Sequence, residues 1–223
     1  MFDGIAGRYD LLNHLLSGNL DRRWRRAAVA ELPEDSNALV LDLCGGTGDL
    51  SVALARGKRA GRVICCDFSH EMLLRAQPKF ERSKDPATCI TVEADGLRLP
   101  FPDATFDGIT VGFGVRNLAD MDQGFREMLR VLKPGCQLVV LEFSKPTAPI
   151  TSRLYNFYLK RMLPRIGDGV SGKEGPYVYL ARTIAGFPDA ATLAGRIREA
   201  GFAACGWKLL TGGIVAAHTA VKA

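Results

Sequence analysis

The sequence predicts an α/β fold built on a mostly parallel sheet of seven strands, with helices ahead of the sheet and an antiparallel hairpin at its C-terminal end. Strand-like and helix-like runs alternate along the chain, and most of these strands are apolar throughout, as in a parallel sheet covered on both faces. The last two strand-like runs are joined only by a short link around "TGG", so they must be antiparallel. The length of 223 residues suits one domain.

The first half of the chain is expected to fold as a helical segment followed by strand–helix repeats. Residues 5–31 are predicted to be helical, because their leucines fall at helical spacing. The acidic residue Glu71 lies in the first turn of a later predicted helix, where it favours a helix start. The predicted elements after residue 31 are a strand at 38–43, a glycine loop, a helix at 49–56, a strand at 62–67 and a helix at 69–80 capped by Ser69.

The second half continues this alternation and then departs from it. Residues 144–179 form an irregular segment rich in proline, aromatic and basic residues. The predicted elements are strands at 89–95 and 106–113, a helix at 121–132 ended by "KPG", a strand at 136–143, a helix at 189–201 and hairpin strands at 205–210 and 214–222. We therefore divide the single domain into an N-terminal helical lid (1–33), a cofactor-binding core (34–143), a substrate- or membrane-side insertion (144–188) and a C-terminal helix with its hairpin (189–223).

Composition narrows the class of protein. No apolar run approaches the roughly 20 residues that span a bilayer, and no secretory leader is evident, so a cytoplasmic protein is expected. The six cysteines lie mostly in apolar strand-like runs and are predicted to be reduced core residues. The three histidines lack metal-ligand spacing, so no metal is expected. The net charge of +5 favours an anionic surface, although the arginines around Trp24 are expected to be a solvated helix face.

The stretch "VLDLCGGTGDLS" predicts a ligand-binding turn between a strand and a helix. A dinucleotide site needs a third glycine, but Gly46 and Gly48 are followed by Ser51 at that position. Asp49 begins the helix, where a carboxylate would repel phosphate. Asp67 ends the next strand, at the place of an acid that accepts hydrogen bonds from ribose hydroxyls. The loop therefore favours a nucleoside ligand without pyrophosphate over a nicotinamide cofactor.

A nucleoside that also carries a cationic group suggests S-adenosylmethionine. Asp42 would lie near the cationic group, and Asp95 with Gly96, at the end of the third strand, would border the adenine. Each of these residues taken alone has a plainer interpretation as a turn or helix cap. In this order, and with the terminal hairpin, they predict a class I methyltransferase fold.

Several strings together resemble the menaquinone and ubiquinone biosynthesis C-methyltransferase family, from Phe2 to about Val221. They are "MFDGIAGRYDLLNHLLSGNLDRRWRR", "VLDLCGGTGDLS", "LPFPDATFDGITVGFGVRNL", "REMLRVLKPG", "LVVLEFSKP", "LPRIG" and "LTGGIVAAH". The resemblance implies methyl transfer from S-adenosylmethionine to a ring carbon of a reduced prenylated quinone, with demethylmenaquinol giving menaquinol as the expected case. Gly112 stands where many members have serine, so a backbone contact is expected there. The cofactor-binding residues that we expect are Asp42, Gly45, Gly46, Thr47, Gly48, Asp67, Phe68, Asp95, Gly96 and Gly112.

Three residues are candidates for catalysis at the carboxyl edge of the sheet. Arg116 would stabilise the quinolate oxygen and Asn117 would orient the hydroxyl or a water, unless Arg116 pairs with a carboxylate and Asn117 caps the next helix. Tyr9 belongs to the N-terminal segment that would close over the substrate or simply pack on the sheet. His218 is a weaker candidate for the base, because a lone strand histidine is usually structural.

The expected partner is a prenylated quinol. The aromatic and basic residues at 153–165 favour a peripheral membrane contact, while a homodimer contact and a cover for the acceptor pocket stay open as alternatives. Other open readings are methylation of 2-methoxy-6-polyprenyl-1,4-benzoquinol in ubiquinone synthesis, of another small lipophilic acceptor, or cofactor binding without catalysis. No nucleic-acid partner is expected, because the sequence has no continuous basic stripe interleaved with exposed aromatics.

Overall fold

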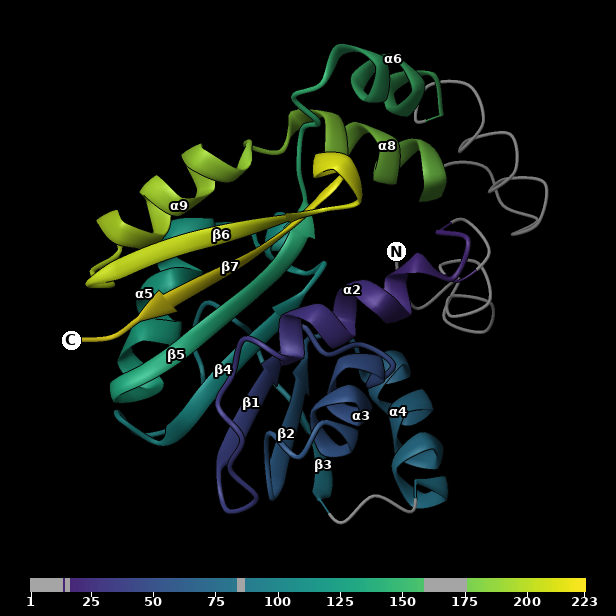
Figure 1. The fold of residues 1–223 in the computed structure, drawn as a ribbon. Coiled ribbons are helices and arrows are strands. Elements are labelled where there is room, and N and C mark those ends of the chain that lie inside the picture. Colours follow the sequence, from purple (N-terminus) through teal and green to yellow (C-terminus); the bar gives the residue numbers. More distant parts are fainter. Residues whose placement is uncertain (1–13, 15–16, 84–86, 159–175) are drawn as a thin grey trace.

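A computed structural model describes residues 14, 17–83, 87–158 and 176–223 (Figure 1). Its centre is one sheet of seven strands in the order β3-β2-β1-β4-β5-β7-β6. Strands β1 to β5 pair in parallel, whereas β7 pairs antiparallel with both β5 and β6. This confirms the predicted sheet and hairpin. The strands are β1 (Leu39–Leu43), β2 (Arg62–Asp67), β3 (Thr88–Glu93), β4 (Phe106–Gly112), β5 (Leu132–Phe143), β6 (Ala204–Leu210) and β7 (Val215–Val221).

Helices precede, connect and extend these strands. Side chains cap three of them: Ser69 as predicted, together with Asp120 and Asp189, each of which accepts a first-turn backbone N–H. The helices are α2 (Leu20–Val29), α3 (Asp49–Arg56), α4 (His70–Arg82), α5 (Met121–Val131), α6 (Pro149–Phe157), α8 (Pro176–Gly186) and α9 (Ala190–Glu199), with short 3-10 turns at η2 (Val115–Asn117) and η4 (Thr211–Gly213).

The inner strands of the sheet are buried on both faces, as their apolar residues predict, whereas the edge strands β3 and β6 are largely exposed. Within β1, Val40 joins a cluster with Trp24 of α2 and Leu54 of α3. Its neighbour Leu41 points to the other face and joins a cluster with residues of α5 and α9, such as Phe125. Because successive strand residues face opposite sides, a strand covered by helices on both faces must be apolar at every position. Figure 1 shows α2 and α3 together on one face and α5 with α9 on the other.

Some predicted boundaries differ from the structure. The segment 144–179 was expected to be irregular, yet it contains α6 and the start of α8 beyond the carboxyl end of β5 (Figure 1). The "KPG" residues were expected to separate a helix from a strand, but they lie within β5. Helix α2 covers only the end of the predicted helix at 5–31, because Asn19 has a left-handed backbone at φ 61°. Residues 5–13, 15 and 16 of that prediction lie outside the described residues.

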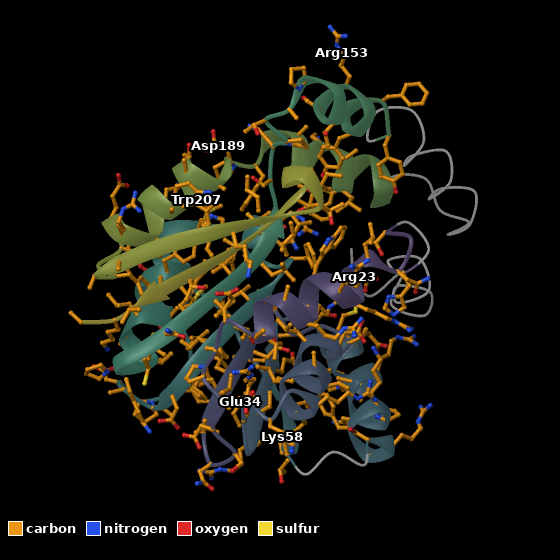
Figure 2. The ribbon with its side chains drawn as sticks, viewed as in Figure 1. Arg23, Glu34, Lys58, Arg153, Asp189 and Trp207 are labelled. Atoms are coloured by element: carbon orange, nitrogen blue, oxygen red, sulfur yellow. The ribbon has the colours of Figure 1, made fainter. Side chains whose placement is uncertain are left out.

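Helix α2 also corrects the expected surface of arginines. Trp24 is buried and Arg23 is exposed, as expected (Figure 2). Arg25 is not solvated, because its side chain is only 13% exposed and pairs with carboxylates of α2 and α3. On α6, Arg153 extends away from the fold (Figure 2). No helix in the described part of the chain is long and apolar enough to cross a bilayer.

The chain order of the strands determines where a ligand can bind. From β1 the chain moves outward to β2 and β3, and it then returns to the other side of β1 to form β4 and β5. In such sheets the crevice lies outside the carboxyl ends of the strands where the order reverses. The glycine loop follows β1, and residues 113–117 follow β4, so both lie at this reversal point.

Candidate active site

The glycine loop is a tight turn braced by the next strand. Gly46 and Gly48 have left-handed backbones, with φ of 55° and 79°. Such values suit glycine, which has no Cβ. The backbone N–H of Gly46 donates to Oδ2 of Asp67 at 2.9 Å, and the N–H of Ser69 donates to Oδ1 of the same carboxylate at 2.9 Å. Asp67 therefore holds the loop in shape.

Asp42 lies beneath the loop and is completely buried. Its carboxylate accepts hydrogen bonds from the hydroxyls of Ser51, at 2.6 Å, and Thr110, at 3.2 Å. Burial raises the pKa of Asp42 from its ordinary 3.8 to about 6, although these hydrogen bonds and the charge of Arg25 oppose the shift. A carboxylate that is costly to ionise without a counter-charge suits a neighbouring cation. That the cofactor supplies this cation stays a prediction.

The raised pKa of Asp42 predicts how the free energy of unfolding changes with pH. Between about pH 4 and about pH 6 the folded chain keeps a proton on Asp42 that the unfolded chain has lost, so rising pH lowers stability. The unfolding free energy of the wild type, relative to Asp42→Asn, should fall by about 2 kcal/mol between about pH 4.5 and about pH 7.5. Urea unfolding of both proteins at the two pH values measures this. Parallel pH dependence of the two proteins would contradict it.

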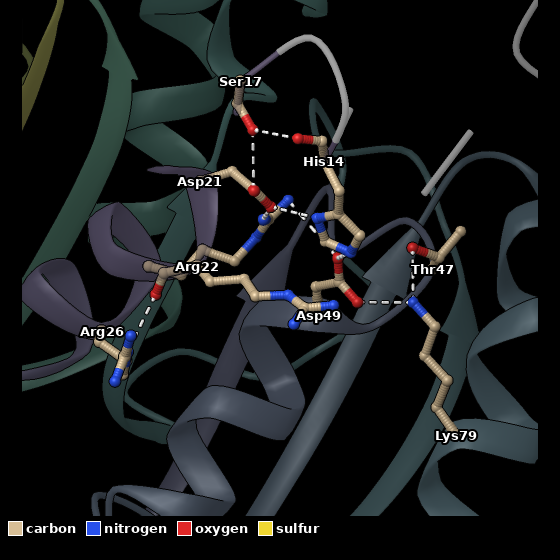
Figure 3. Close-up of polar contacts among 9 residues, drawn as sticks. His14, Ser17, Asp21, Arg22, Arg26, Thr47, Asp49 and Lys79 are labelled. Carbon is tan, nitrogen blue, oxygen red and sulfur yellow. Dashed lines mark hydrogen bonds and ion pairs between the residues drawn. The ribbon is translucent and has the colours of Figure 1, made fainter. Parts of the chain in front are cut away.

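A network of charges joins helix α2 to the start of α3 (Figure 3). Asp21 accepts hydrogen bonds from Ser17, at 2.9 Å, and from Arg25, and its Oδ2 lies 2.8 Å from Nδ1 of His14. Burial raises the pKa of Asp21, but Arg25, Ser17 and His14 together hold it below its ordinary value. Asp49 completes the network on α3, where Nζ of Lys79 donates to its Oδ1 at 2.6 Å (Figure 3).

This network corrects two expectations from the sequence. Asp49 was expected to repel phosphate, but Lys79 and Arg25 offset its charge, so the case against pyrophosphate rests on the missing glycine and the hairpin. The histidines were expected to lack metal-ligand partners, yet ligand atoms of His14, Asp21 and Asp49 lie within 4.8 Å of one another. The carboxylates already bind two cationic side chains, so we assign this cluster to ion pairing.

One cavity of about 440 Å³ opens between the glycine loop and the helices beyond β5. It brings together six of the residues predicted from sequence: Asp42, Gly45, Gly46, Thr47, Gly112 and Arg116. Arg116 belongs to a mostly apolar wall, where its Cζ lies 5.3 Å from the centre of the Phe143 ring. The other residues of that wall are Trp24, Phe113, Phe143, Tyr155, Tyr158, Leu180, Ile184 and Ile214.

Other predicted residues lie outside the cavity lining. Gly48 and Asp67 shape the loop from behind it. Asp95 accepts a hydrogen bond from the backbone N–H of Leu97 at 2.9 Å, which is the plainer turn interpretation. Gly96 is buried, while Phe68 is 77% exposed beside Asp67 and offers a bare aromatic face. Their predicted contacts with adenine stay predictions.

Arg116 lines the cavity from η2 and forms a buried ion pair. Its Nη1 donates to Oε1 of Glu142 at 2.7 Å and to the carbonyl of Phe113 at 2.5 Å. Burial raises the pKa of Glu142, and the guanidinium offsets part of that shift. The Nε–H of Arg116 is buried and has no hydrogen-bond partner among the described residues. The predicted pairing with a carboxylate is thus present, and one donor of Arg116 is still unused.

The remaining candidates lie elsewhere. Asn117 does not cap the next helix, because Asp120 does; its Oδ1 accepts a hydrogen bond from the Tyr179 hydroxyl at 3.5 Å. His218 is buried on β7, where its Nε2 lies 2.9 Å from the carbonyl of Ala190, and burial lowers its pKa. It does not line the cavity, so it has the structural role expected of a lone strand histidine. Tyr9 lies outside the described residues.

Phe113 is a cavity residue that the sequence analysis missed. It follows Gly112 with a left-handed backbone at φ 58°, a conformation that is uncommon for a bulky residue and concentrates at functional sites. Its ring packs against Trp24, with centroids 6.1 Å apart, and against Phe143, with centroids 4.9 Å apart. The available signal was the pair of glycines in "GFGVRN", which frames an aromatic residue directly after a strand.

Comparison with known proteins supports the assignment to a methyltransferase family. The profile of the ubiE/COQ5 methyltransferase family matches residues 1–222. The chain is 44% identical to the demethylmenaquinone methyltransferase of Corynebacterium kroppenstedtii, over 100% of this chain and 93% of that protein. It is 41% identical to the ubiquinone/menaquinone biosynthesis C-methyltransferase UbiE of Hahella chejuensis, over 100% of this chain and 90% of that protein.

A solved structure confirms the fold class. The chain matches a SAM dependent methyltransferase from Aquifex aeolicus with a TM-score of 0.63 and 18% sequence identity, over 89% of both chains. The fold is therefore the class I methyltransferase fold that the strand order and hairpin predicted. The family matches likewise confirm the resemblance carried by the sequence motifs. This chain belongs to the ubiE/COQ5 methyltransferase family.

Proposed function

We propose that this protein transfers a methyl group from S-adenosylmethionine to a ring carbon of a reduced prenylated quinone, with demethylmenaquinol giving menaquinol. The single observation that carries the proposal is the cavity, which joins a methyltransferase glycine loop to an aromatic and aliphatic wall. Relatives at 44% and 41% identity carry names from menaquinone and ubiquinone synthesis, which supports a quinol as the acceptor.

The residues of the loop fit this cofactor. Gly45 lets the loop pack closely on β2, because an added Cβ would lie 2.6 Å from Sγ of Cys65 and 3.1 Å from the carbonyl of Asp42. The buried carboxylate of Asp42 suits a nearby cation, and Gly46, Thr47 and Gly112 line the same end of the cavity. When bound, S-adenosylmethionine supplies the methyl group. The electron pair of the broken bond between sulfur and the methyl carbon stays on sulfur. The ring carbon supplies the electron pair of the new C–C bond and then loses its proton.

The other end of the cavity suits an aromatic acceptor. Phe113, Phe143 and Ile184 provide an apolar surface for a ring; Ile184 is buried, and the two phenylalanines are partly buried. Arg116 lies in the same wall and is positioned to stabilise negative charge on a ring oxygen, which makes the neighbouring carbon nucleophilic. Methylation of 2-methoxy-6-polyprenyl-1,4-benzoquinol uses the same chemistry, and the naming of the Hahella relative favours it as the second candidate.

The test is methylation of demethylmenaquinone in its two redox states. Purified protein is incubated with S-adenosylmethionine and either chemically reduced or oxidised demethylmenaquinone, and products are identified by mass spectrometry. We expect methylated product only from the reduced sample, because the oxidised ring is too electron-poor to attack the methyl group. Parallel samples with the reduced benzoquinone test the second candidate. If no quinol is methylated while the cofactor still binds, the acceptor is wrong.

For the aromatic and basic residues at 153–165 the sequence also favoured a peripheral membrane contact, with a dimer contact or a cover for the acceptor pocket as alternatives. In the described part of that segment Phe157 is 58% exposed on α6, whereas Tyr155 is buried. Residues 159–175, which hold Lys160, Arg161, Met162, Leu163 and Arg165, lie outside the described residues. Both contacts stay predictions.

A further inference from the structure

Tyr155 contributes a polar group to the apolar wall of the cavity. It lies on α6, is only 8% exposed, and packs with Ile184 in a small cluster that also contains Phe143 and Leu180. Tyr155 also lines the cavity. Its hydroxyl is buried and has no hydrogen-bond partner within the described residues. Buried hydroxyls nearly always have a partner, because leaving one unpaired costs the hydration that it loses. A lone phenol in a cavity wall therefore indicates a bound partner.

A second unused donor lies in the same wall. The Nε–H of Arg116 is also buried without a partner in the described part of the chain, and Arg116 lines the cavity with Tyr155. The two side chains share a neighbour, since Cζ of Arg116 lies 5.3 Å from the centre of the Phe143 ring and Phe143 packs in the cluster of Tyr155. Two buried donors among aromatic and aliphatic side chains complement a flat apolar ligand that carries oxygen acceptors.

The charge state of Tyr155 decides what it does. Burial raises the pKa of its hydroxyl, the negative charge of Glu142 raises it further, and the charge of Arg116 opposes this only in part. Tyr158, which also faces it, has a pKa raised by burial. The phenol therefore keeps its proton at physiological pH. It acts as a hydrogen-bond donor and not as a base.

We propose that the Tyr155 hydroxyl donates a hydrogen bond to a ring oxygen of the acceptor, orienting the ring and stabilising the charge on that oxygen. This rests on the proposed function, because it takes the aromatic acceptor as given. It assigns to α6 a role in substrate recognition, which goes beyond the cover for the acceptor pocket that the sequence had left open beside a membrane or dimer contact.

The test is Tyr155→Phe, which removes the hydroxyl and keeps the ring. Reduced demethylmenaquinone with a short prenyl chain is the substrate, and turnover number and KM are measured separately. A donor to a charged oxygen is expected to lower the turnover number about ten- to a hundredfold with a smaller change in KM. Binding of the oxidised quinone without cofactor, followed by quenching of Trp24 fluorescence in the cavity, should weaken about tenfold. S-adenosylhomocysteine affinity should be unchanged, which shows that the variant is folded.

Tyr179→Phe is the matched control. It makes the same chemical change on the neighbouring helix α8, at a hydroxyl that lies outside the cavity and already contacts Asn117. We expect its turnover and quinone affinity to stay within about twofold of the wild type. The proposal is overturned if Tyr155→Phe binds the quinone and turns over like the wild type. It is also overturned if Tyr155→Phe and Tyr179→Phe lose turnover and quinone affinity to the same extent. If the wild type binds the quinone but methylates no quinol, the proposed function fails while the binding comparison still decides the role of Tyr155.

Discussion

Gly48→Ala should reduce affinity for S-adenosylhomocysteine by about a hundredfold. Gly48 caps α3 with φ at 79°, and an added Cβ would lie 2.6 Å from the ring of Phe80 and 3.1 Å from Cβ of Ala76. An alanine must therefore bear a left-handed backbone and also push the loop away from α4. The loop carries Gly46 and Thr47 into the cavity, and displacing binding groups by about 1 Å costs affinity on the order of a hundredfold. Isothermal titration calorimetry measures the change.

Gly135→Ala separates the effect of the backbone from that of the contact. Gly135 has nearly the same φ, 77°, but a Cβ there would meet nothing within 4 Å. Both variants should lose roughly 1 kcal/mol of unfolding free energy to backbone strain, and only Gly48→Ala should lose ligand affinity. Equal affinities in the two variants would mean that Phe80 moves aside freely and that the loop tolerates a side chain.

The predictable part of this molecule is the part governed by local pattern. Strands that are buried on both faces are apolar throughout, so β1, β2, β4 and β5 could be read from the sequence. The short link between β6 and β7 allowed only a hairpin. The glycine loop and Arg116 followed from their places after β1 and β4, because ligands bind where the strand order reverses.

The apolar wall of the cavity was not predictable in the same way. Helices α6 and α8 lie in a segment whose prolines suggested irregular structure, yet α6 begins at a proline, Pro149. Proline is favourable in the first turn, where its missing N–H is not needed, so this residue was a start signal. That Tyr155 enters the cavity depends on how α6 packs against β5 and α8, which no local spacing encodes.

Arg116 both pairs with the buried Glu142 and is proposed to stabilise the quinolate oxygen, so replacing it should have a large effect on stability and on turnover. Arg116→Met leaves the carboxylate of Glu142 buried without its cation, so the unfolding free energy should fall by about 3–5 kcal/mol. Turnover should fall at least about a hundredfold, because the charge that stabilises the quinolate oxygen is gone. A loss of activity in this variant alone does not distinguish the two effects. Denaturant unfolding and quinol methylation must therefore be measured on the same protein.

Adding Glu142→Gln to Arg116→Met separates the loss of stability from the loss of turnover. The double variant has no isolated buried charge, and the new amide oxygen can still accept the backbone N–H of Phe143, which Glu142 accepts at 2.9 Å. Most of the lost stability should return, because replacing both partners of a buried pair costs much less than removing one. Turnover should stay low if Arg116 acts on the acceptor. Recovery of turnover together with stability would show that the pair only holds η2 against β5, and the charge on the quinolate would then have to be stabilised by Tyr155 alone.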